Sequence, residues 1–457
     1  MIDTAASGAP RNSPGMPEAR KLTLVPLIAA TYFIVSGGPF GLEDIVQRSG
    51  YRGAILILLA TPLLWAVPTT LMVSELASAV PREGGYYTWV LRALGRFWGF
   101  QEAWLSLTGS VFDMAIYPTL FVAYLGHMLP AVYAGARAMW IGVAFVALSA
   151  VWNLLGARAV GRSSVLLGAV LLAPFAALTV YAALAGAGAG GPASAAPRFD
   201  FLAGIMVAMW NFMGWDNAST VAGEVARPQR TYPLAMASAA LLVTLSYILP
   251  IAAVASTGLP SSAWSTGGWA EVARRVLPAG LTATILAMAI TAAGMISAAG
   301  TQNALTMALS RLPAVMAEDG FLPRVFARRW RQTGAPWVAI LACATAWAVC
   351  LQLPFVKLVL LDVLLTGLSI VLEFVALVAL RLREPNLARP YRVPGGLAGA
   401  IGIGIPPLLL IVVAAVRNHA EPVGPINALE LGALLVGAGV ALYLLSGPRS
   451  RKGALLR

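Results

Sequence analysis

The sequence predicts an all-α integral membrane protein with twelve transmembrane helices, of which the first and the sixth are discontinuous. Three observations predict this class. Of the 457 residues, 59% are hydrophobic and only 11% are charged, whereas soluble domains carry about 25% charged residues. Twelve apolar segments reach the length of roughly 20 residues that a helix needs to cross a bilayer. Glycine, proline and carboxylate residues interrupt two of these segments.

The twelve segments define the expected spans and leave short polar loops between them. We expect both termini on one side of the membrane because the number of spans is even. The spans are predicted at residues 22–46, 53–79, 97–128, 137–155, 163–186, 201–223, 233–257, 279–309, 336–355, 356–381, 398–416 and 427–446.

The distribution of basic residues predicts the orientation and excludes a nucleic-acid binder. With the termini in the cytoplasm, about 23 of the 31 Lys and Arg residues fall in cytoplasmic loops and tails, and about 8 fall outside. This is the positive-inside bias of a cell-membrane protein. The basic residues behind the net charge of +12 therefore orient the protein in the membrane, and the lipid bilayer is their expected partner. Residues 1–20 and 447–457 are expected to be cytoplasmic tails.

The first span contains a break at Ser36–Gly41. Gly37, Gly38 and Gly41, together with a proline, do not sustain a continuous helix. Glu43 follows the break and adds negative charge in the outer half of the membrane. Such a break is typical of a substrate site, although the glycines could instead serve close helix packing.

The third span carries a polar stripe on one helical face. Glu102, Ser106, Gly109, Asp113 and Tyr117 are spaced by three or four residues. A polar face inside a membrane helix is expected to line the bundle interior. Asp113 and Tyr117 are therefore candidate substrate contacts; the alternative is that the carboxylates only pair with residues of other helices.

The sixth span contains the stretch Met209–Ser219, which combines aromatic, amide and carboxylate residues. Trp210 offers an indole face that attracts ammonium groups, and Met213 and Trp215 lie beside it in the sequence. Asp216 follows the break. Burial favours its neutral acid form, whereas a helix start or a bound cation favours the carboxylate. Asp216 could therefore exchange a proton for a cation; the tryptophans could instead be core residues.

Polar residues in three other spans complete the candidates. Gln302 and Asn303 form a polar patch deep in the eighth span. In the tenth span, Asp362 is expected near the outer surface, and Glu373 lies deep enough to need a partner. Glu75 of the second span is expected to pair with an arginine of the loop that follows it.

The sequence offers no site for a cofactor or a metal ion. Its only histidines are His127 and His419, near span ends, and its only cysteines are Cys343 and Cys350. Haem or zinc would need paired ligands in the interior. We therefore expect no cofactor.

At these residues the chain resembles the amino acid–polyamine–organocation superfamily. The resemblance spans about residues 22–415. It rests on the Ser36–Gly41 break, Ser74–Gly85, Phe212–Asp216 and three loop motifs. These motifs are Glu224 with Pro228, Glu318–Pro323 and Arg389–Pro394. Within the superfamily it is most similar to the polyamine:proton symporters of the plant polyamine-uptake type, on Ser36–Asp44, Gly99–Trp104 and Gly214–Glu224.

The resemblance implies a five-plus-five inverted repeat with helices 1 and 6 broken at midplane and the substrate between spans 1, 3, 6, 8 and 10. The repeats would be residues 21–186 and 198–381, followed by two helices in 397–446. From these residues and the resemblance together, we predict the substrate-binding residues Tyr32, Ser36, Gly37, Gly38, Glu43, Asp113, Tyr117, Trp210, Met213, Trp215, Asp216, Gln302 and Asn303, with Asp216 and Glu43 in proton coupling.

Three departures from relatives limit what the resemblance implies. Trp210 matches the substrate-stacking Trp of arginine/agmatine exchangers, but Leu305 stands near the position of their second Trp. Leu171 stands near the Lys that some amino acid members carry in span 5. The loop after span 3 lacks a cysteine, so we expect no disulfide-linked heavy chain.

The charge balance favours a proton-coupled carrier of small organic cations, with polyamines first. Glu43, Asp113 and Asp216 are acidic, and the predicted spans place no Lys or Arg at their depth. An amino acid permease is the main alternative, and a membrane nutrient sensor without net flux is a second. A channel is disfavoured because no repeated pore loop is visible. An enzyme is disfavoured because no nucleophile, base and oxyanion group cluster together.

Overall fold

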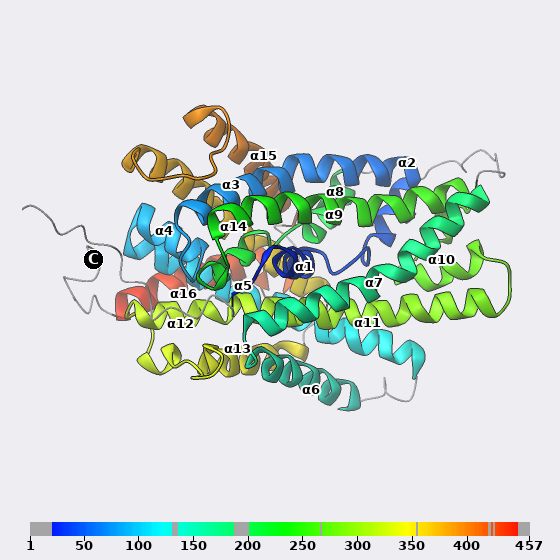
Figure 1. The fold of residues 1–457 in the computed structure, drawn as a ribbon, viewed down its shortest axis with the longest axis horizontal. Helices are drawn as coiled ribbons and strands as arrows, with labels where there is room; N and C mark the ends of the chain where they lie inside the picture. The colour runs from blue at the N-terminus through cyan, green and yellow to red at the C-terminus, as the bar shows by residue number, and fades with distance from the viewer. Residues whose placement is uncertain are drawn as a thin grey trace, which may run out of the picture.

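The computed structural model describes residues 21–129, 136–186, 201–265, 267–352, 355–418, 422–423 and 426–446. These residues form an elongated bundle of helices, with α4 and α12 at one end and α10 at the other (Figure 1). The predicted tails 1–20 and 447–457 lie outside the described residues.

The elements follow the predicted spans in order, with additional short helices in the loops. They are α1 (Leu24–Val35), α2 (Glu43–Thr61), η2 (Pro62–Ala66), α3 (Val67–Ala79), α4 (Tyr86–Leu94), α5 (Arg96–Met128), α6 (Ala136–Asn153), α7 (Ala157–Gly186), α8 (Phe201–Asn211), η4 (Asp216–Glu224), α9 (Pro228–Ser256), η5 (Ser261–Ala263), α10 (Trp269–Val276), α11 (Leu281–Leu309), α12 (Arg311–Glu318), η6 (Arg324–Ala327), α13 (Trp337–Val349), η7 (Cys350–Gln352), α14 (Phe355–Arg383), α15 (Gly396–Asn418), β1 (Pro422–Val423), β2 (Ile426–Asn427) and α16 (Ala428–Ser446). Strands β1 and β2 pair antiparallel.

Eight helical runs within the described residues are long and apolar enough to cross a bilayer. Three shorter apolar helices accompany them, at 24–35, 337–349 and 429–445. The protein is therefore an all-helical multi-pass membrane protein. The runs are fewer than the predicted twelve partly because the first and sixth predicted spans are divided into shorter pieces.

The first break occurs where the sequence predicts it. Helix α1 ends at Val35, and Gly37, Gly38 and Gly41 have φ values of 62°, 106° and 86°. These left-handed conformations are open to glycine at little cost and interrupt a right-handed helix. The chain becomes helical again at Glu43, and Gly50 (φ 65°) sets the short segment that follows the break apart from the rest of α2.

The second break lies opposite the first. Helix α8 ends at Asn211, Gly214 has a φ of 91°, and η4 begins at Asp216 as a 3₁₀ helix rather than an α-helix. A Cβ atom on Gly214 would lie 3.0 Å from the carbonyl oxygen of Ile34. The two breaks therefore pack against each other, and the second requires a residue without a side chain.

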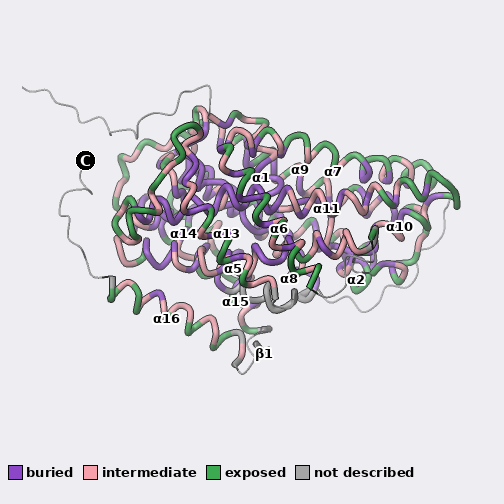
Figure 2. The backbone as a smooth tube through the Cα atoms, turned by 90° about the horizontal axis from the view of Figure 1, so that it is seen from below, coloured by how far each residue is buried: buried purple, intermediate pink, exposed green. Residues whose placement is uncertain are grey.

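The broken helices occupy the centre of the bundle. Helix α1 packs against α7, α9 and α11, and α5 packs against both α11 and α14. The buried segments cluster in this centre, whereas α16 lies along the outside with exposed and half-buried residues (Figure 2). The long helices thus form a frame around the two breaks.

Candidate functional site

Hydrogen bonds hold the first break in its irregular conformation. The Gly38 N–H donates to Ser36 Oγ at 3.0 Å, and the Gly37 N–H donates to the Tyr32 carbonyl at 3.2 Å. A Cβ atom on Gly37 would lie 2.5 Å from Thr301 Oγ1. Helix α11 therefore contacts the break so closely that position 37 must be glycine.

Helix α9 ties both breaks together through two adjacent residues. Tyr32 donates from its hydroxyl to Ser246 Oγ at 3.0 Å. Tyr247 donates to the Asn211 carbonyl at 2.8 Å, which satisfies an acceptor at the end of α8. The sequence analysis missed Ser246 and Tyr247, because a polar pair in a helix gives no sign of which break it faces.

Trp210 lies between the first break and α5. A Cβ atom on Gly41 would be 3.4 Å from its ring, and the ring also packs against the buried residues Ala115 and Ile116 of α5. The indole is only partly buried. Trp210 therefore stands beside the first break, and its role as a substrate contact stays a prediction.

Asp113 and Asp362 form an acidic pair between α5 and α14. The Tyr117 hydroxyl donates to Asp113 Oδ1 at 2.9 Å, and the Thr366 hydroxyl donates to Asp362 Oδ1 at 2.9 Å. The two carboxylates lie close enough to repel each other. Asp362 is buried, with 7% of its surface exposed, and its expected position toward the outer membrane surface stays a prediction.

A second acidic group surrounds the start of η4. The backbone N–H groups of Asp216 and Asn217 lie against the Asp216 carboxylate, as at other helix N-termini. Glu102 and Glu373 are fully buried and lie close enough to interact with Asp216. The Ser369 hydroxyl donates to Glu102 Oε1. Five carboxylates from three elements thus gather in the centre of the bundle.

Glu43 stands apart from this centre. It is fully buried at the start of α2, where the N–H groups of Glu43 and Gly41 lie nearest to its carboxylate. The covering segment includes Trp269, whose indole N–H donates to the Pro39 carbonyl at 2.8 Å. The structure therefore brings Glu43 to the break but not to Asp216.

No described Lys or Arg forms an ion pair with any of these buried carboxylates. The arginines gather instead at the end of the bundle that contains α4 and α12, which we call the basic end. Ion pairs there join Arg92 to Glu384, Arg311 to Glu224, Arg329 to Glu83 and Glu318, and Arg381 and Arg389 to Glu75.

These ion pairs correct one expectation. The sequence analysis expected Glu75 to pair with an arginine of the loop after span 2. Its partners are Arg381 (Nε–Oε1 2.9 Å) and Arg389 (Nε–Oε1 3.3 Å). The reason is that the end of α14 and the loop after it fold against α3.

The remaining predicted residues have different surroundings. Asn303 accepts at Oδ1 from Asn153 Nδ2 at 2.7 Å and so faces α6. Gln302 is buried, and neither atom of its amide has a hydrogen-bond partner among the described residues. Met213 and Trp215 are buried in the main core. The hydrogen bond of Asn303 therefore joins α11 to α6 and does not involve either helix break.

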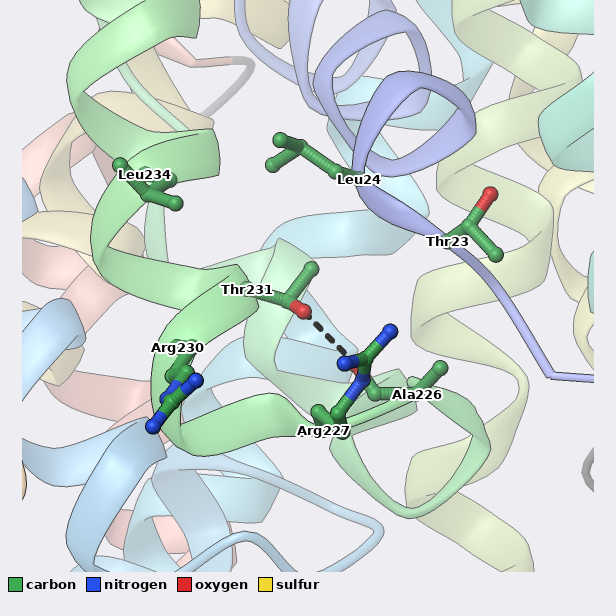
Figure 3. A pocket seen from close by; sticks show the side chains of 7 residues that line it. All are labelled: Thr23, Leu24, Ala226, Arg227, Arg230, Thr231 and Leu234. Carbon is green, nitrogen blue, oxygen red and sulfur yellow. Dashed lines mark hydrogen bonds between the residues drawn. The ribbon is translucent and has the colours of Figure 1, made fainter.

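A surface pocket of about 300 Å³ lies outside the central acids. Figure 3 shows its lining, which comes from the start of α1, from the residues just before α9 and from the first turns of α9. Thr231 donates to the Ala226 carbonyl at 2.7 Å along its edge. The central carboxylates, in contrast, are buried (Asp216 is 2% exposed), so this conformation encloses them.

Two broken helices that enclose buried acids inside a multi-pass membrane bundle are the features of a transporter rather than an enzyme. A family model described as "Amino acid permease" matches residues 28–436. The chain belongs to this amino acid permease family and is a secondary transporter.

Relatives with assigned names agree with this class. The chain is 34% identical to the polyamine transporter PUT1 of Oryza sativa subsp. japonica, over 94% of this chain and 81% of that protein. It is 33% identical to the polyamine transporter RMV1 of Arabidopsis thaliana, over 94% and 88%. It is 26% identical to the serine/threonine exchanger SteT of Bacillus subtilis (strain 168), over 71% and 74%.

Proposed function

We propose that this protein transports small organic cations across the cell membrane and that a proton gradient drives the transport. Polyamines are the first substrate candidates. The observation that carries the proposal is the group of buried carboxylates without a described cationic partner. A buried charge needs a partner or neutralisation. A polyamine supplies the missing cations, and the names of the two plant relatives point to the same substrate class.

The proposed site is the region where the breaks meet α5 and α14. Trp210 would hold an ammonium group against its ring, an attraction worth about 2 kcal/mol when desolvated. Asp113 with Tyr117, and Ser36, Gly37 and Gly38 of the break, would complete the contacts. Tyr32 would position the break, and Gln302, Met213 and Trp215 would bound the site.

Asp216 is the proposed coupling residue. It lies close enough to Asp362 and to Glu373 to interact with both carboxylates. Such a group of acids holds protons when no cation is present and releases them as cations bind. Glu43 is proposed to perform the same exchange nearer the outer surface.

Alternating access is the proposed transport cycle. Buried ion pairs of Glu224 and Glu75, together with more exposed pairs, close the basic end. We propose that this end faces the cytoplasm, with both termini. Opening toward the cytoplasm would separate η4 from α12, and with them Glu224 from Arg311. The twelve spans and the five-plus-five inverted repeat, with units at 21–186 and 198–381, belong to this proposal.

The decisive experiment measures radiolabelled putrescine and arginine uptake into proteoliposomes with and without an inward proton gradient. We expect gradient-dependent accumulation of putrescine that unlabelled spermidine inhibits. Saturable uptake of neutral amino acids without polyamine competition would instead support an amino acid permease, which the similarity to a serine/threonine exchanger favours. Binding without accumulation would support a nutrient sensor and contradict transport.

A further inference from the structure

Helices α5 and α14 meet in a symmetric register that places the same chemistry at both ends of their contact. The helices run antiparallel, because Ser106 contacts Ser369 while Gly109 lies against Asp362. This register places Glu102 near Glu373 and Asp113 near Asp362. Between the acidic pairs, the Ser106 and Ser369 hydroxyls are 3.0 Å apart. Each helix thus carries two carboxylates eleven residues apart. On each helix, a serine lies four residues from the glutamate that is nearer the basic end.

The spacing of the pairs follows from helix geometry. Eleven residues at 1.5 Å per residue separate the two acidic pairs by about 16 Å along the helices. The Asp113–Asp362 pair is the outer pair, beside Tyr117. The Glu102–Glu373 pair is the inner pair, nearer the basic end. Because Ser106 contacts Ser369, a ligand cannot pass between the helices and would lie along the seam.

Unsatisfied polar groups mark the inner pair as a binding site rather than a packed ion cluster. Both carboxylate oxygens of Glu373 are buried without a hydrogen-bond partner among the described residues. The hydroxyl of Tyr86, from α4, is also buried without such a partner, and it lies among Asp216, Glu102 and Glu373. Tyr86 therefore presents its hydroxyl to the acidic group from a third side, beside Ser106.

Asp216, at the start of η4, is buried and is the fifth acid of this region. Its carboxylate interacts with Asp362 of the outer pair and with Glu373 of the inner pair. One of its oxygens has no hydrogen-bond partner among the described residues. The seam therefore presents two acidic pairs, and Asp216 lies within electrostatic reach of both.

We propose that this seam is a binding site for one extended linear polyamine, whose end nitrogens occupy the outer and inner pairs and whose middle nitrogens face Asp216. The inference rests on the proposed function and specifies its substrate by length. A tetramine such as spermine has thirteen bonds between its end nitrogens and extends to about 16 Å, at roughly 1.25 Å per bond. A diamine such as putrescine has five bonds and extends to about 6 Å, so it reaches one pair only.

The test compares two polyamines on the purified full-length protein in lipid nanodiscs. Radiolabelled spermine and putrescine are titrated against the unmodified protein, Glu373→Gln and Asp113→Asn. We expect Glu373→Gln to weaken spermine binding about tenfold or more, as for the loss of one partner of a buried charge pair. Putrescine binding should weaken clearly less, because a diamine reaches only one pair. Asp113→Asn should weaken both ligands.

The outcomes separate this inference from the proposed function. Equal effects of Glu373→Gln on spermine and putrescine, or no effect on either, would overturn the two-pair site while polyamine binding stands. Absence of binding of either ligand to the unmodified protein would overturn the proposed function and this inference with it.

A second variant protects the test against misfolding. Thermal unfolding of each variant reports whether it folds. If Glu373→Gln does not fold, Tyr86→Phe keeps the ring and removes only the hydroxyl that faces the inner pair. It is expected to weaken spermine binding more than putrescine binding, and equal weakening of both would contradict the proposal.

Discussion

Arg311 Nε donates to Glu224 Oε1 at 2.9 Å, and both side chains are buried at the basic end of the bundle. The pair joins the start of α12 to the end of η4. Arg311 also donates to the Met307 carbonyl at 2.7 Å. The interaction therefore ties the second half of the broken sixth span to the frame formed by α11 and α12.

Replacing only one member of this pair should destabilise the protein strongly. Arg311→Met leaves Glu224 buried without its cation, which costs about 3–5 kcal/mol. The double variant Arg311→Met with Glu224→Gln should recover part of this loss because it leaves no unpaired charge. Thermal unfolding of the purified proteins in detergent measures both effects. A double variant as unstable as the sum of the single variants would show that the pair contributes nothing as a pair.

Asp216→Asn should abolish accumulation against a gradient. The amide keeps the size of the side chain at the start of η4 but can no longer exchange a proton, so the cation and the proton are uncoupled. Uptake by proteoliposomes with and without a proton gradient measures the loss. Glu271→Gln, at an exposed acid in α10, is the matched control and should behave as the unmodified protein. Normal uphill transport by Asp216→Asn would disprove the coupling role.

Trp210→Ala should weaken polyamine binding by roughly 1–2 kcal/mol, since the ammonium group loses its aromatic partner. This corresponds to about a 5- to 30-fold increase in Kd. Equilibrium binding of radiolabelled putrescine measures it. The control is Trp98→Ala at an exposed tryptophan of α5, which should leave Kd unchanged. If the affinity of Trp210→Ala is unchanged, Trp210 only packs in the core and does not bind the substrate.

Gly37→Ala should prevent the first break from forming normally. A side chain at φ 62° is strained by about 1–2 kcal/mol. Its Cβ atom would also approach Thr301 Oγ1 to 2.5 Å. We expect loss of transport and a lower unfolding temperature, measured in parallel. Gly402→Ala is the control, since a Cβ atom there meets no heavy atom within 4 Å; a stable, active Gly37→Ala protein would show that the break tolerates a side chain.

The sequence by itself determined the membrane class and the positions of both breaks. Apolar segments of the right length specify membrane helices because lipid leaves a backbone no other partner. The cluster Gly37, Gly38 and Gly41 specifies the first interruption because it favours backbone conformations that end a helix. Trp210 and Asp216 could likewise be chosen as candidates because polar and aromatic groups are costly or unusual at that depth.

Only the tertiary structure decided which acids meet. Asp113 and Asp362 are both visible in the sequence, but their pairing depends on the register of α5 against α14, which distant packing contacts such as Ser106–Ser369 set. The partners of Glu75 and the place of Asn303 against Asn153 were undetermined for the same reason. A helical pattern states which side chains share a face, whereas the partner of that face depends on how the whole bundle packs.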